Sequence, residues 1–153
     1  MAVEPGQSAP EFTLKDQAGN EVSLSDYRGK QPVVLVFYPF TFTGVCQGEL
    51  CEIRDDPSTF DNAGAAVLAV SCDTRHAQAQ WAEQQGFTFP VLSDFWPHGE
   101  VSRRYGVFNE EQGCANRATF VLDADGIVRE IVASGSLGTP REYAAYVAAL
   151  GKF

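Results

Sequence analysis

An unbroken apolar run at residues 33–38, leading directly into a helix start, constrains the fold of this chain more than any other feature. A strand that is apolar on both faces must be covered on both, as in a parallel or mixed sheet with helices on each side. The residues that follow the run lead to Cys46, at the position where the next helix is expected to begin. The first backbone N–H groups of a helix lack intrahelical partners and carry partial positive charge, so a thiol there ionises readily. We therefore predict a reactive thiolate at Cys46.

Predicted strands and helices alternate along the rest of the chain. Residues 9–15 and 21–24 alternate apolar and polar side chains around a turn-forming cluster, which predicts an N-terminal β-hairpin. Further strands are expected at 66–71, 89–92, 118–122 and 128–133, the last two joined as a hairpin, and helices at 44–55, 57–64, 74–86 and 99–105. This order predicts an α/β protein with a central mixed sheet, helices on both faces and an N-terminal β-hairpin. That arrangement is the thioredoxin-like fold, in a single domain of residues 1–153.

The C-terminal helix carries the clearest start signal. Residues 139–142, Thr-Pro-Arg-Glu, form a capping box with proline at the first helical position. The residues that follow repeat at the spacing of one helix face, and this predicted core-facing stripe comprises Tyr143, Tyr146, Val147 and Leu150. The polar segment at 109–116 is expected to be a loop.

The charge balance restricts the partners of this chain. Asp and Glu outnumber Lys and Arg 20 to 11, which gives a net charge of −9. Nucleic acid and anionic membrane surfaces require clustered Lys and Arg, so neither is an expected partner. No segment approaches the roughly 18 apolar residues of a membrane span, and the N-terminus lacks the features of a signal peptide, so we expect a cytoplasmic protein.

The spacing of the four cysteines, at positions 46, 51, 72 and 114, argues against two common sites. They contain no Cys-x-x-Cys pair, which counts against a zinc site and against a thioredoxin-type dithiol. In a reducing compartment, any disulfide is expected to be transient and catalytic. Near Cys46, the Thr43 hydroxyl is able to donate a hydrogen bond to a thiolate, and Pro39 adds a fixed bend that can shield the sulfur.

Two separated motifs resemble those of a known family. Pro39, Thr43 and Cys46 stand in the pattern Pro-x-x-x-Thr-x-x-Cys, which resembles the active-site signature of peroxiredoxins. Residues 116–120, Asn-Arg-Ala-Thr-Phe, resemble the strand that supplies the active-site arginine of that family, which would be Arg117. The likeness spans nearly the whole chain and is strongest to the actinobacterial alkyl hydroperoxide reductase E subgroup, at residues 42–50 and 93–99.

The resemblance implies a thiol-dependent peroxidase that needs no cofactor. Cys46 would be the peroxidatic cysteine, which attacks a peroxide oxygen and becomes a sulfenic acid. Since lowering a thiol pKa also lowers its nucleophilicity, the transition state needs donors, for which Arg117, Thr43 and the Cys46 backbone N–H are candidates. Glu49, one helical turn after Cys46, either orients Arg117 or is an ordinary acid of the first helical turn.

The same resemblance implies a set of partners. The expected substrates are hydrogen peroxide and organic hydroperoxides. The expected reductant is a low-molecular-weight thiol or a thioredoxin- or mycoredoxin-like protein, and the expected assembly is a homodimer or a larger homo-oligomer.

Cys51 leaves the recycling route open. It stands five residues after Cys46, a spacing similar to that of the resolving cysteine in bacterioferritin-comigratory-type peroxiredoxins. Within an intact helix the two residues are about 140° apart around the axis and about 7.5 Å apart along it, so a disulfide requires the first turns to unwind. Two nearby glycines lower the cost of unwinding. Cys114 is a second candidate for resolving Cys46, and Cys72 is expected to pack in the core.

Two other functions are compatible with the predicted fold. One is a thiol-disulfide oxidoreductase using Cys46 and Cys51, although the absence of Cys-x-x-Cys and the presence of Thr43 and Arg117 count against it. The other is a non-catalytic thioredoxin-like interaction protein, in which Cys46 would be an inert core thiol.

Six further residues can be interpreted either as ordinary structural residues or as functional ones. His76 and His98 are expected to be solvated or capping residues, because neither has an acidic or cysteine partner at metal-ligand spacing. Four aromatic residues are expected to pack in the core, or, as the family resemblance implies for some of them, to line a peroxide pocket or a dimer interface, namely Phe40, Phe42, Phe95 and Trp96.

Overall fold

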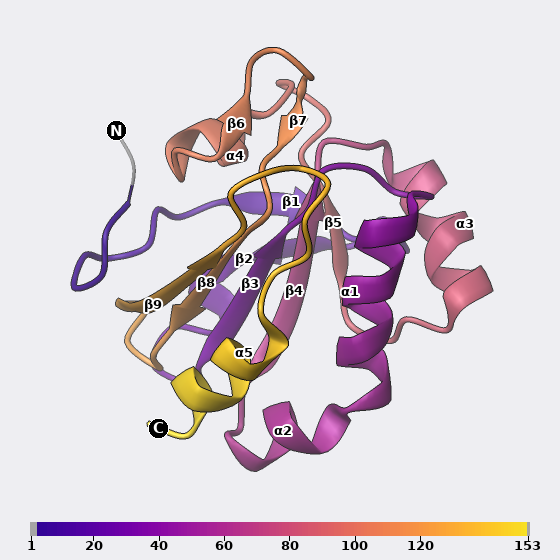
Figure 1. Ribbon diagram of the computed structural model, residues 1–153. Coiled ribbons are helices and arrows are strands. Elements are labelled where there is room, and N and C mark those ends of the chain that lie inside the picture. The colour runs from indigo at the N-terminus through magenta and orange to yellow at the C-terminus, as the bar shows by residue number, and fades with distance from the viewer. Residues whose placement is uncertain (1–2, 153) are drawn as a thin grey trace.

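The structure, a computed structural model, describes residues 3–152 and contains the predicted alternation of strands and helices (Figure 1). Its strands are β1 (Thr13–Lys15), β2 (Glu21–Ser23), β3 (Val33–Phe37), β4 (Ala66–Ser71), β5 (Val91–Ser93), β6 (Phe108–Asn109), β7 (Cys114–Ala115), β8 (Ala118–Leu122) and β9 (Val128–Ala133). Its helices are α1 (Gly44–Asp55), α2 (Pro57–Asn62), α3 (Arg75–Gln85), α4 (Glu100–Arg104) and α5 (Tyr143–Leu150), with a short 3₁₀ helix η1 (Leu24–Asp26). Within this part of the chain, no helix combines the length and the apolar character needed to cross a membrane.

Seven strands form one mixed sheet in the order β2-β1-β5-β4-β3-β8-β9, and β6 and β7 form a separate hairpin. The central strand β3 pairs parallel with β4 and antiparallel with β8. The N-terminal hairpin joins the sheet where β1 pairs antiparallel with β5, and β8 and β9 form a hairpin at the opposite edge. The predicted mixed sheet and both predicted hairpins are confirmed.

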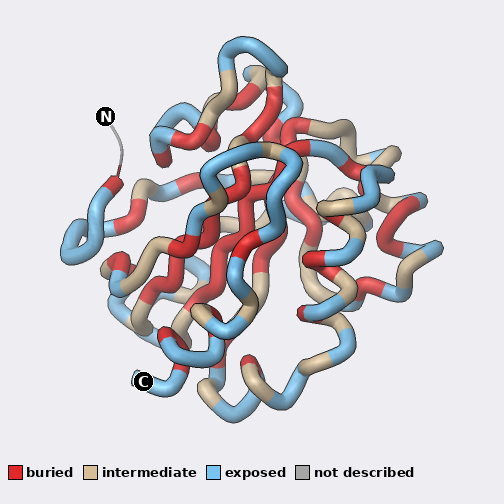
Figure 2. The backbone as a smooth tube through the Cα atoms, in the orientation of Figure 1, coloured by how far each residue is buried: buried red, intermediate tan, exposed pale blue. Residues whose placement is uncertain are grey.

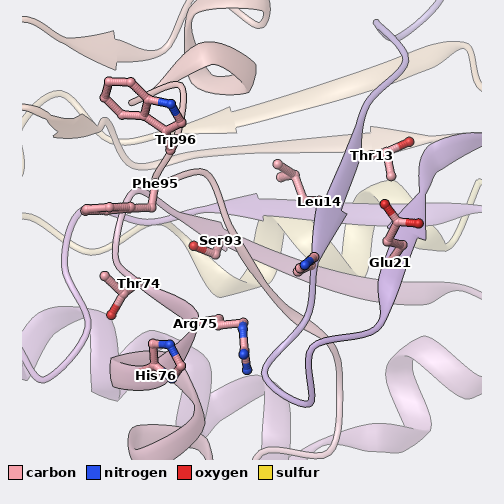
Figure 3. Close-up of a pocket in the computed structure, with 10 residues that line it drawn as sticks. Thr13, Leu14, Glu21, Thr74, Arg75, His76, Ser93, Phe95 and Trp96 are labelled. Atoms are coloured by element: carbon pink, nitrogen blue, oxygen red, sulfur yellow. The ribbon is translucent and has the colours of Figure 1, made fainter.

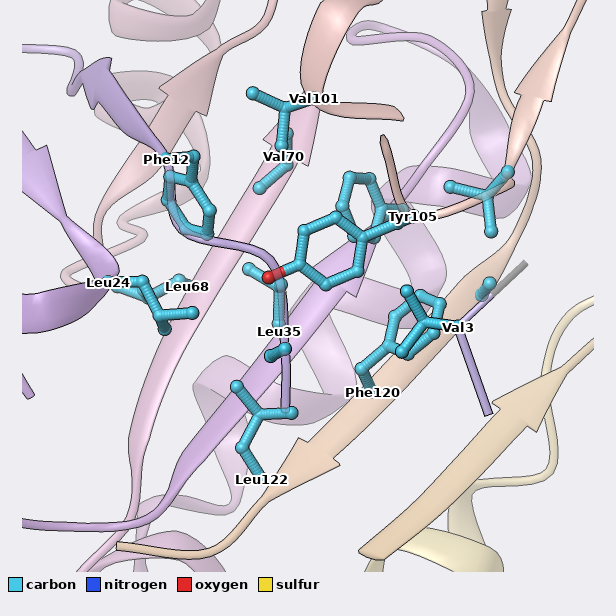
Figure 4. Close-up of a cluster of buried hydrophobic side chains, with 14 of the residues drawn as sticks. Val3, Phe12, Leu24, Leu35, Leu68, Val70, Val101, Tyr105, Phe120 and Leu122 are labelled. Carbon is cyan, nitrogen blue, oxygen red and sulfur yellow. The ribbon is translucent and has the colours of Figure 1, made fainter. Parts of the chain in front are cut away.

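The apolar run that forms β3 lies between two cores, and its residues alternate between them. Val34 and Val36 belong to one core, which is completed by side chains from α1, α2, α3 and α5. Leu35 and Phe37 belong to the other, which is completed by α4 and by N-terminal residues such as Phe12 (Figure 4). Figure 2 shows the buried backbone concentrated in these central strands. Each fully buried side chain of this kind contributes about 1.5–3 kcal/mol, so both faces of β3 stabilise the fold, as the apolar run predicts.

The predicted starts of the first helices are confirmed, although α2 ends at Asn62, two residues before its predicted end. α1 begins directly after Thr43, and Pro57 occupies the first turn of α2. Thr74 caps α3 because its hydroxyl accepts a hydrogen bond from the Ala77 backbone N–H at 3.3 Å. Gly86 then ends α3 in the left-handed conformation, with φ of 70°, which glycine adopts without strain.

The C-terminal helix begins later than its sequence predicts. α5 starts at Tyr143 with Glu142 as its N-cap, so the predicted capping box at 139–142 is wrong. Arg141 is held outside the helix, because its backbone N–H and its guanidinium both bind the buried carboxylate of Glu49. Val147 is 48% exposed, so the predicted core-facing stripe is wrong at this residue. The residues of α5 that are buried are Tyr146, Ala149 and Leu150.

Two shorter segments also differ from prediction. β5 spans Val91–Ser93 rather than residues 89–92, because Pro90 has no N–H to donate and the strand begins after it. The segment at 109–116 is not a plain loop, since it contains the β6–β7 hairpin, in which Asn109 pairs with Cys114. The Gly113 backbone N–H closes the turn of this hairpin by donating to the Asn109 carbonyl at 2.8 Å.

Candidate active site

Cys46 lies in the first turn of α1, a few residues beyond the carboxyl end of β3. Its side chain is fully buried in the core that also contains Tyr38, Leu50 and Trp81. The predicted position at the start of the helix is confirmed, beside backbone N–H groups that have no intrahelical partner. The fold thereby combines a helix N-terminus with exclusion of bulk water from the sulfur.

Thr43 is the N-cap of α1, but its hydroxyl binds another group and not the Cys46 sulfur. The hydroxyl donates a hydrogen bond to the Phe40 carbonyl at 2.6 Å, and the residue is exposed. Between them, Phe42 has a φ of 66°, a left-handed conformation that costs roughly 1–2 kcal/mol for a residue other than glycine. The turn before Cys46 is therefore strained, and the predicted bond from Thr43 to the thiolate requires its hydroxyl to leave Phe40.

Glu49, one turn further along α1, is the centre of a buried ion-pair cluster. Arg117, which directly precedes β8, donates from Nη1 to Glu49 Oε1 at 2.6 Å. Arg141 donates to the same carboxylate from Nη2 at 2.8 Å, from Nε at 2.9 Å and from its backbone N–H at 2.7 Å. All three side chains are at least nine-tenths buried. The contact between Glu49 and Arg117 that the sequence suggests is present in the structure.

The single carboxylate of Glu49 offsets part of the positive charge of the two guanidinium groups in this cluster. Burial alone would raise the pKa of the Glu49 carboxyl, but hydrogen bonds and charge from Arg141, with the charge of Arg117, hold that pKa below its ordinary value. Burial would likewise lower the pKa of the Arg141 guanidinium, and Glu49 raises it instead. Glu49 is therefore a carboxylate and Arg141 a cation at neutral pH, in surroundings where an unpaired charge would be strongly destabilising.

Arg141 is the site residue that sequence analysis missed. Besides Glu49, it donates from Nη1 to the Phe37 carbonyl at 2.6 Å and to the Thr119 hydroxyl at 3.1 Å, which joins α1 to β3 and β8. Arg117 similarly donates from Nε to the Leu137 carbonyl at 2.6 Å. The two arginines thus fasten the segment before α5 onto the sheet beside the helix that carries Cys46. In the sequence Arg141 stands after a proline in an apparent helix cap, and no spacing distinguishes it.

The other three cysteines occupy different environments. Cys51 is half-buried, and its thiol lies 3.7 Å from Oε1 of Gln85, at the end of α3. Cys114 is buried, and burial raises the pKa of its thiol to about 11. Burial raises the pKa of Cys72 to about 12, and its sulfur lies 3.8 Å from the Ser102 hydroxyl. These surroundings agree with the expected packing role of Cys72, and the raised pKa of the Cys114 thiol counts against Cys114 as an attacking thiolate at neutral pH.

The four aromatic residues near the site do not pack in the core. Their exposed fractions are 37% for Phe40, 51% for Phe42, 46% for Phe95 and 82% for Trp96, so the core-packing interpretation is wrong. Phe40 and Phe95 instead line a cavity of about 270 Å³ together with the buried Pro39. Phe40 and Phe95 therefore form surface beside Pro39, Phe42 is exposed in the turn before Cys46, and Trp96 does not line this cavity.

The expectation of solvated or capping histidines holds for His76 but not for His98, which is partly buried and does not cap α4. His76 is exposed at the start of α3. His98 joins two segments, since its Nδ1 lies 3.1 Å from the Phe95 carbonyl and its Nε2 lies 2.7 Å from the Gly113 carbonyl. Within residues 3–152, the structure contains no group of three or more potential metal ligands.

We expect the substitution Glu49→Gln to lower the free energy of unfolding at pH 7 by about 3–5 kcal/mol, because it leaves two buried guanidinium groups without a counter-charge. Since folding lowers the Glu49 pKa, the stability it contributes is present above the unfolded pKa of about 4.3 and is lost as the pH falls through the folded value. Urea denaturation at pH 7 and below pH 4 measures both effects, and the difference between the two proteins should shrink at the lower pH.

Asp55→Asn is the matched control for this substitution. Asp55 lies later in the same helix and pairs with Arg54 on the surface, so its amide variant should unfold at nearly the wild-type urea concentration. Superimposable curves for wild type and Glu49→Gln at pH 7 would contradict a structural role for the buried cluster.

Comparisons with known proteins show the family of this chain. A model of the AhpC/TSA family matches residues 5–131. The chain is 56% identical over 124 residues to alkyl hydroperoxide reductase E of Mycobacterium tuberculosis, with 81% of each chain covered, and 39% identical over 136 residues to peroxiredoxin-2 of Mus musculus, covering 82% of this chain and 67% of the mouse protein. Its structure is similar to that of the peroxidoxin BcpB from Mycobacterium tuberculosis, with a TM-score of 0.87, 32% identity and coverage of 98% of this chain and 97% of the other. The chain therefore belongs to the AhpC/TSA family, and it is a peroxiredoxin with a thioredoxin-like fold, a thiol-dependent peroxidase.

Proposed function

We propose that Cys46 is the peroxidatic cysteine and that it reduces hydrogen peroxide and organic hydroperoxides. The observation that carries this proposal is the arrangement of α1, which holds a buried thiol in its first turn and, one turn later, a carboxylate bound to Arg117. In this proposal Arg117 and the Cys46 backbone N–H are the donors that stabilise charge on the peroxide, and Thr43 becomes a third if its hydroxyl leaves Phe40. Glu49 is a positioning residue in this scheme, because it acts on Arg117 rather than on the substrate. Pro39 shields the sulfur.

The proposed reaction begins with attack of the Cys46 thiolate on one oxygen of the peroxide. A sulfur–oxygen bond forms, the oxygen–oxygen bond breaks, and both electrons of that bond leave with the departing oxygen. A proton converts this oxyanion to water or an alcohol, and the protein is left with a sulfenic acid. The negative charge that builds on the leaving oxygen is where a preorganised guanidinium lowers the barrier.

Access to the sulfur requires movement of the turn before α1. Cys46 is fully buried, whereas Phe42, Thr43 and Gly44 beside it are exposed. The left-handed Phe42 places strain in this turn, which reduces the free energy needed to open it. Opening there both admits a small peroxide and frees the Thr43 hydroxyl.

We propose that Cys51 recycles the enzyme by attacking the sulfenic acid, which forms a Cys46–Cys51 disulfide and releases water. Cys51 supports this role because its one polar contact is the long bond to Gln85, and because Cys114 is buried with a raised pKa. Glu49 lies between the two thiols in the sequence, so unwinding of residues 46–51 must withdraw it from both arginines. The free-energy cost of separating Glu49 from both arginines keeps α1 folded before Cys46 is oxidised.

Peptide mapping after one equivalent of peroxide tests this route. Both cysteines lie between Lys30 and Arg54, so trypsin leaves them on one peptide, whereas cleavage after Glu49 separates them. We expect the two halves to remain joined without reductant and to separate with it, in wild type and in Cys114→Ser. In Cys51→Ser we expect a persistent added oxygen at Cys46. Separate halves and a persistent oxidised Cys46 in the wild-type protein would contradict the route and leave direct reduction by an external thiol.

The proposed partners follow from the same site. A low-molecular-weight thiol or a thioredoxin- or mycoredoxin-like protein would reduce the oxidised enzyme in the cytoplasm. Exposed Phe42, Phe95 and Trp96 support a homodimer or larger homo-oligomer, because aromatic residues are enriched where subunits meet.

The two cores share one sheet, which supports a single domain over residues 1–153.

A further inference from the structure

The carboxylate of Glu49 fills a binding site that two distant arginines build around it. Its Oε1 accepts from Nη1 of Arg117 at 2.6 Å and from Nη2 of Arg141 at 2.8 Å. Its Oε2 accepts from the backbone N–H of Arg141 at 2.7 Å and from Nε of Arg141 at 2.9 Å. We call these four donors the arginine cradle. Among residues 3–152, Glu49 is the only acidic partner of either arginine, so one of the two positive charges stays uncompensated.

The arginine cradle is held in place by groups outside α1. Arg117 donates from Nε to the Leu137 carbonyl at 2.6 Å. Arg141 donates from Nη1 to the Phe37 carbonyl at 2.6 Å and to the Thr119 hydroxyl at 3.1 Å. These acceptors belong to β3, to β8 and to the segment before α5. Unwinding of α1 therefore removes the carboxylate but leaves its donors in position, and such preorganisation reduces the cost of binding another anion.

Burial distinguishes these two arginines from one at the surface. Figure 3 shows Arg75 beside Thr74 and His76, along a surface groove of about 460 Å³. Arg75 is half-buried, so water can solvate its guanidinium and an added anion gains little there. The side chains of Arg117 and Arg141 are only 4% and 1% exposed. Losing their carboxylate leaves two desolvated cations without a counter-charge, which strongly favours a replacement anion.

The proposed recycling step is the event that withdraws Glu49. A disulfide between Cys46 and Cys51 requires the segment that joins them to leave its helical conformation, and Glu49 lies within that segment. The arginine cradle is thus filled in the reduced enzyme and vacated in the oxidised enzyme. The redox state of the two thiols thereby controls whether an external anion can bind.

We propose that the arginine cradle binds the carboxylate of a small external molecule when Glu49 is withdrawn. In the native enzyme this inference rests on the proposed function, because the Cys46–Cys51 disulfide is what empties the cradle. The ligand takes over the four hydrogen bonds that Glu49 gives up. It must leave before α1 can rewind, so it shifts the equilibrium between oxidised and reduced enzyme toward the disulfide.

Rescue of Glu49→Ala by formate tests the arginine cradle without any disulfide. The reduced full-length protein is unfolded in urea with sodium formate or with sodium chloride at equal ionic strength. We expect formate to lower the unfolding equilibrium constant of Glu49→Ala about tenfold at ten times its dissociation constant. A variant that is unfolded in chloride should refold in formate. Equal effects of the two salts on Glu49→Ala would overturn the cradle.

Asp55→Ala is the matched control for this rescue. It removes a carboxylate from the same helix, but the partner of Asp55 is Arg54 at the surface. Formate and chloride should act alike on Asp55→Ala and on the reduced wild-type protein, whose cradle is already filled. A formate effect in Asp55→Ala as large as that in Glu49→Ala would reduce the rescue to a general salt effect and overturn the proposal.

Equilibration with 2-mercaptoethanol and its disulfide tests the oxidised enzyme. These reagents exchange two electrons and two protons with the Cys46–Cys51 pair and carry no charge, so formate is the only carboxylate added. We expect formate, but not chloride, to raise the ratio of disulfide to dithiol about tenfold at ten times its dissociation constant. Arg117→Gln should lose most of this dependence, whereas Arg75→Gln, which removes an arginine outside the cradle, should keep it.

The two experiments separate failure of the cradle from failure of the recycling route. A wild-type ratio that does not respond to formate would overturn binding in the oxidised enzyme. Peptide mapping that finds no Cys46–Cys51 disulfide would refute the recycling route by itself. In that case the formate rescue of Glu49→Ala still decides whether the arginine cradle binds a free carboxylate.

Discussion

Replacing Cys46 by serine is expected to abolish peroxide consumption. A serine hydroxyl occupies nearly the same buried space, but it does not ionise at neutral pH and has no accessible sulfenic acid state. Stopped-flow mixing with hydrogen peroxide or an alkyl hydroperoxide measures the loss. Trp81 is a built-in reporter, because its indole N–H donates to Oε1 of Gln47, the residue next to Cys46.

Cys72→Ser and Cys51→Ser are the matched controls for this experiment. Both exchange the same atoms, and both should consume the first equivalent of peroxide at nearly the wild-type rate, because neither residue is the proposed point of attack. Cys51→Ser should fail only in later turnovers. A wild-type rate in the Cys46→Ser protein would refute the assignment of the peroxidatic cysteine.

Replacing Arg117 by alanine is expected to slow the reaction with peroxide by about 10²–10³-fold, the usual effect of removing one donor that stabilises transition-state charge. Arg117 is buried and held by two acceptors, Glu49 and the Leu137 carbonyl, so its guanidinium is fixed before substrate arrives. Such preorganisation is what makes the donor effective. The second-order rate constant from stopped flow is the measurement.

Arg129→Ala provides the control for Arg117→Ala. It removes an arginine that pairs with Asp123 at the surface, and we expect no change in the rate. Since Glu49 keeps its bonds to Arg141, the Arg117→Ala protein should remain folded, which a thermal melt can verify. A folded Arg117→Ala protein that reacts within twofold of wild type would remove Arg117 from the proposed mechanism.

Local sequence patterns predict most of the framework around this site. The apolar run before Pro39 forms the central strand because both of its faces are buried, and Pro57 marks where α1 gives way to α2. Cys46 could be placed at a helix start from sequence, because the end of the apolar run and the short segment after Pro39 mark where β3 ends and α1 begins. These features depend on residues close together in the chain.

The features that sequence does not predict depend on distant residues. Arg141 reaches Glu49 across 92 positions, and that contact keeps it out of the helix that its own local sequence favours. The Thr43 hydroxyl can donate a hydrogen bond either to the Cys46 sulfur or to the Phe40 carbonyl. The left-handed conformation of Phe42 brings the Phe40 carbonyl within hydrogen-bonding distance. The exposure of Trp96 likewise depends on the arrangement of the loops at the end of the sheet, and no local sequence pattern predicts it.

Trapping of sulfenic acid by dimedone, resolved by peptide, tests the central claim most directly. The Cys51→Ser protein, treated with less than one equivalent of hydrogen peroxide, should retain its first oxidation product because the proposed resolving thiol is absent. We predict that the adduct forms at Cys46 and is lost in the Cys46→Ser, Cys51→Ser double variant. An adduct at Cys72 or Cys114 with Cys46 unmodified would contradict the proposal that the thiol in the first turn of α1 reacts with peroxide.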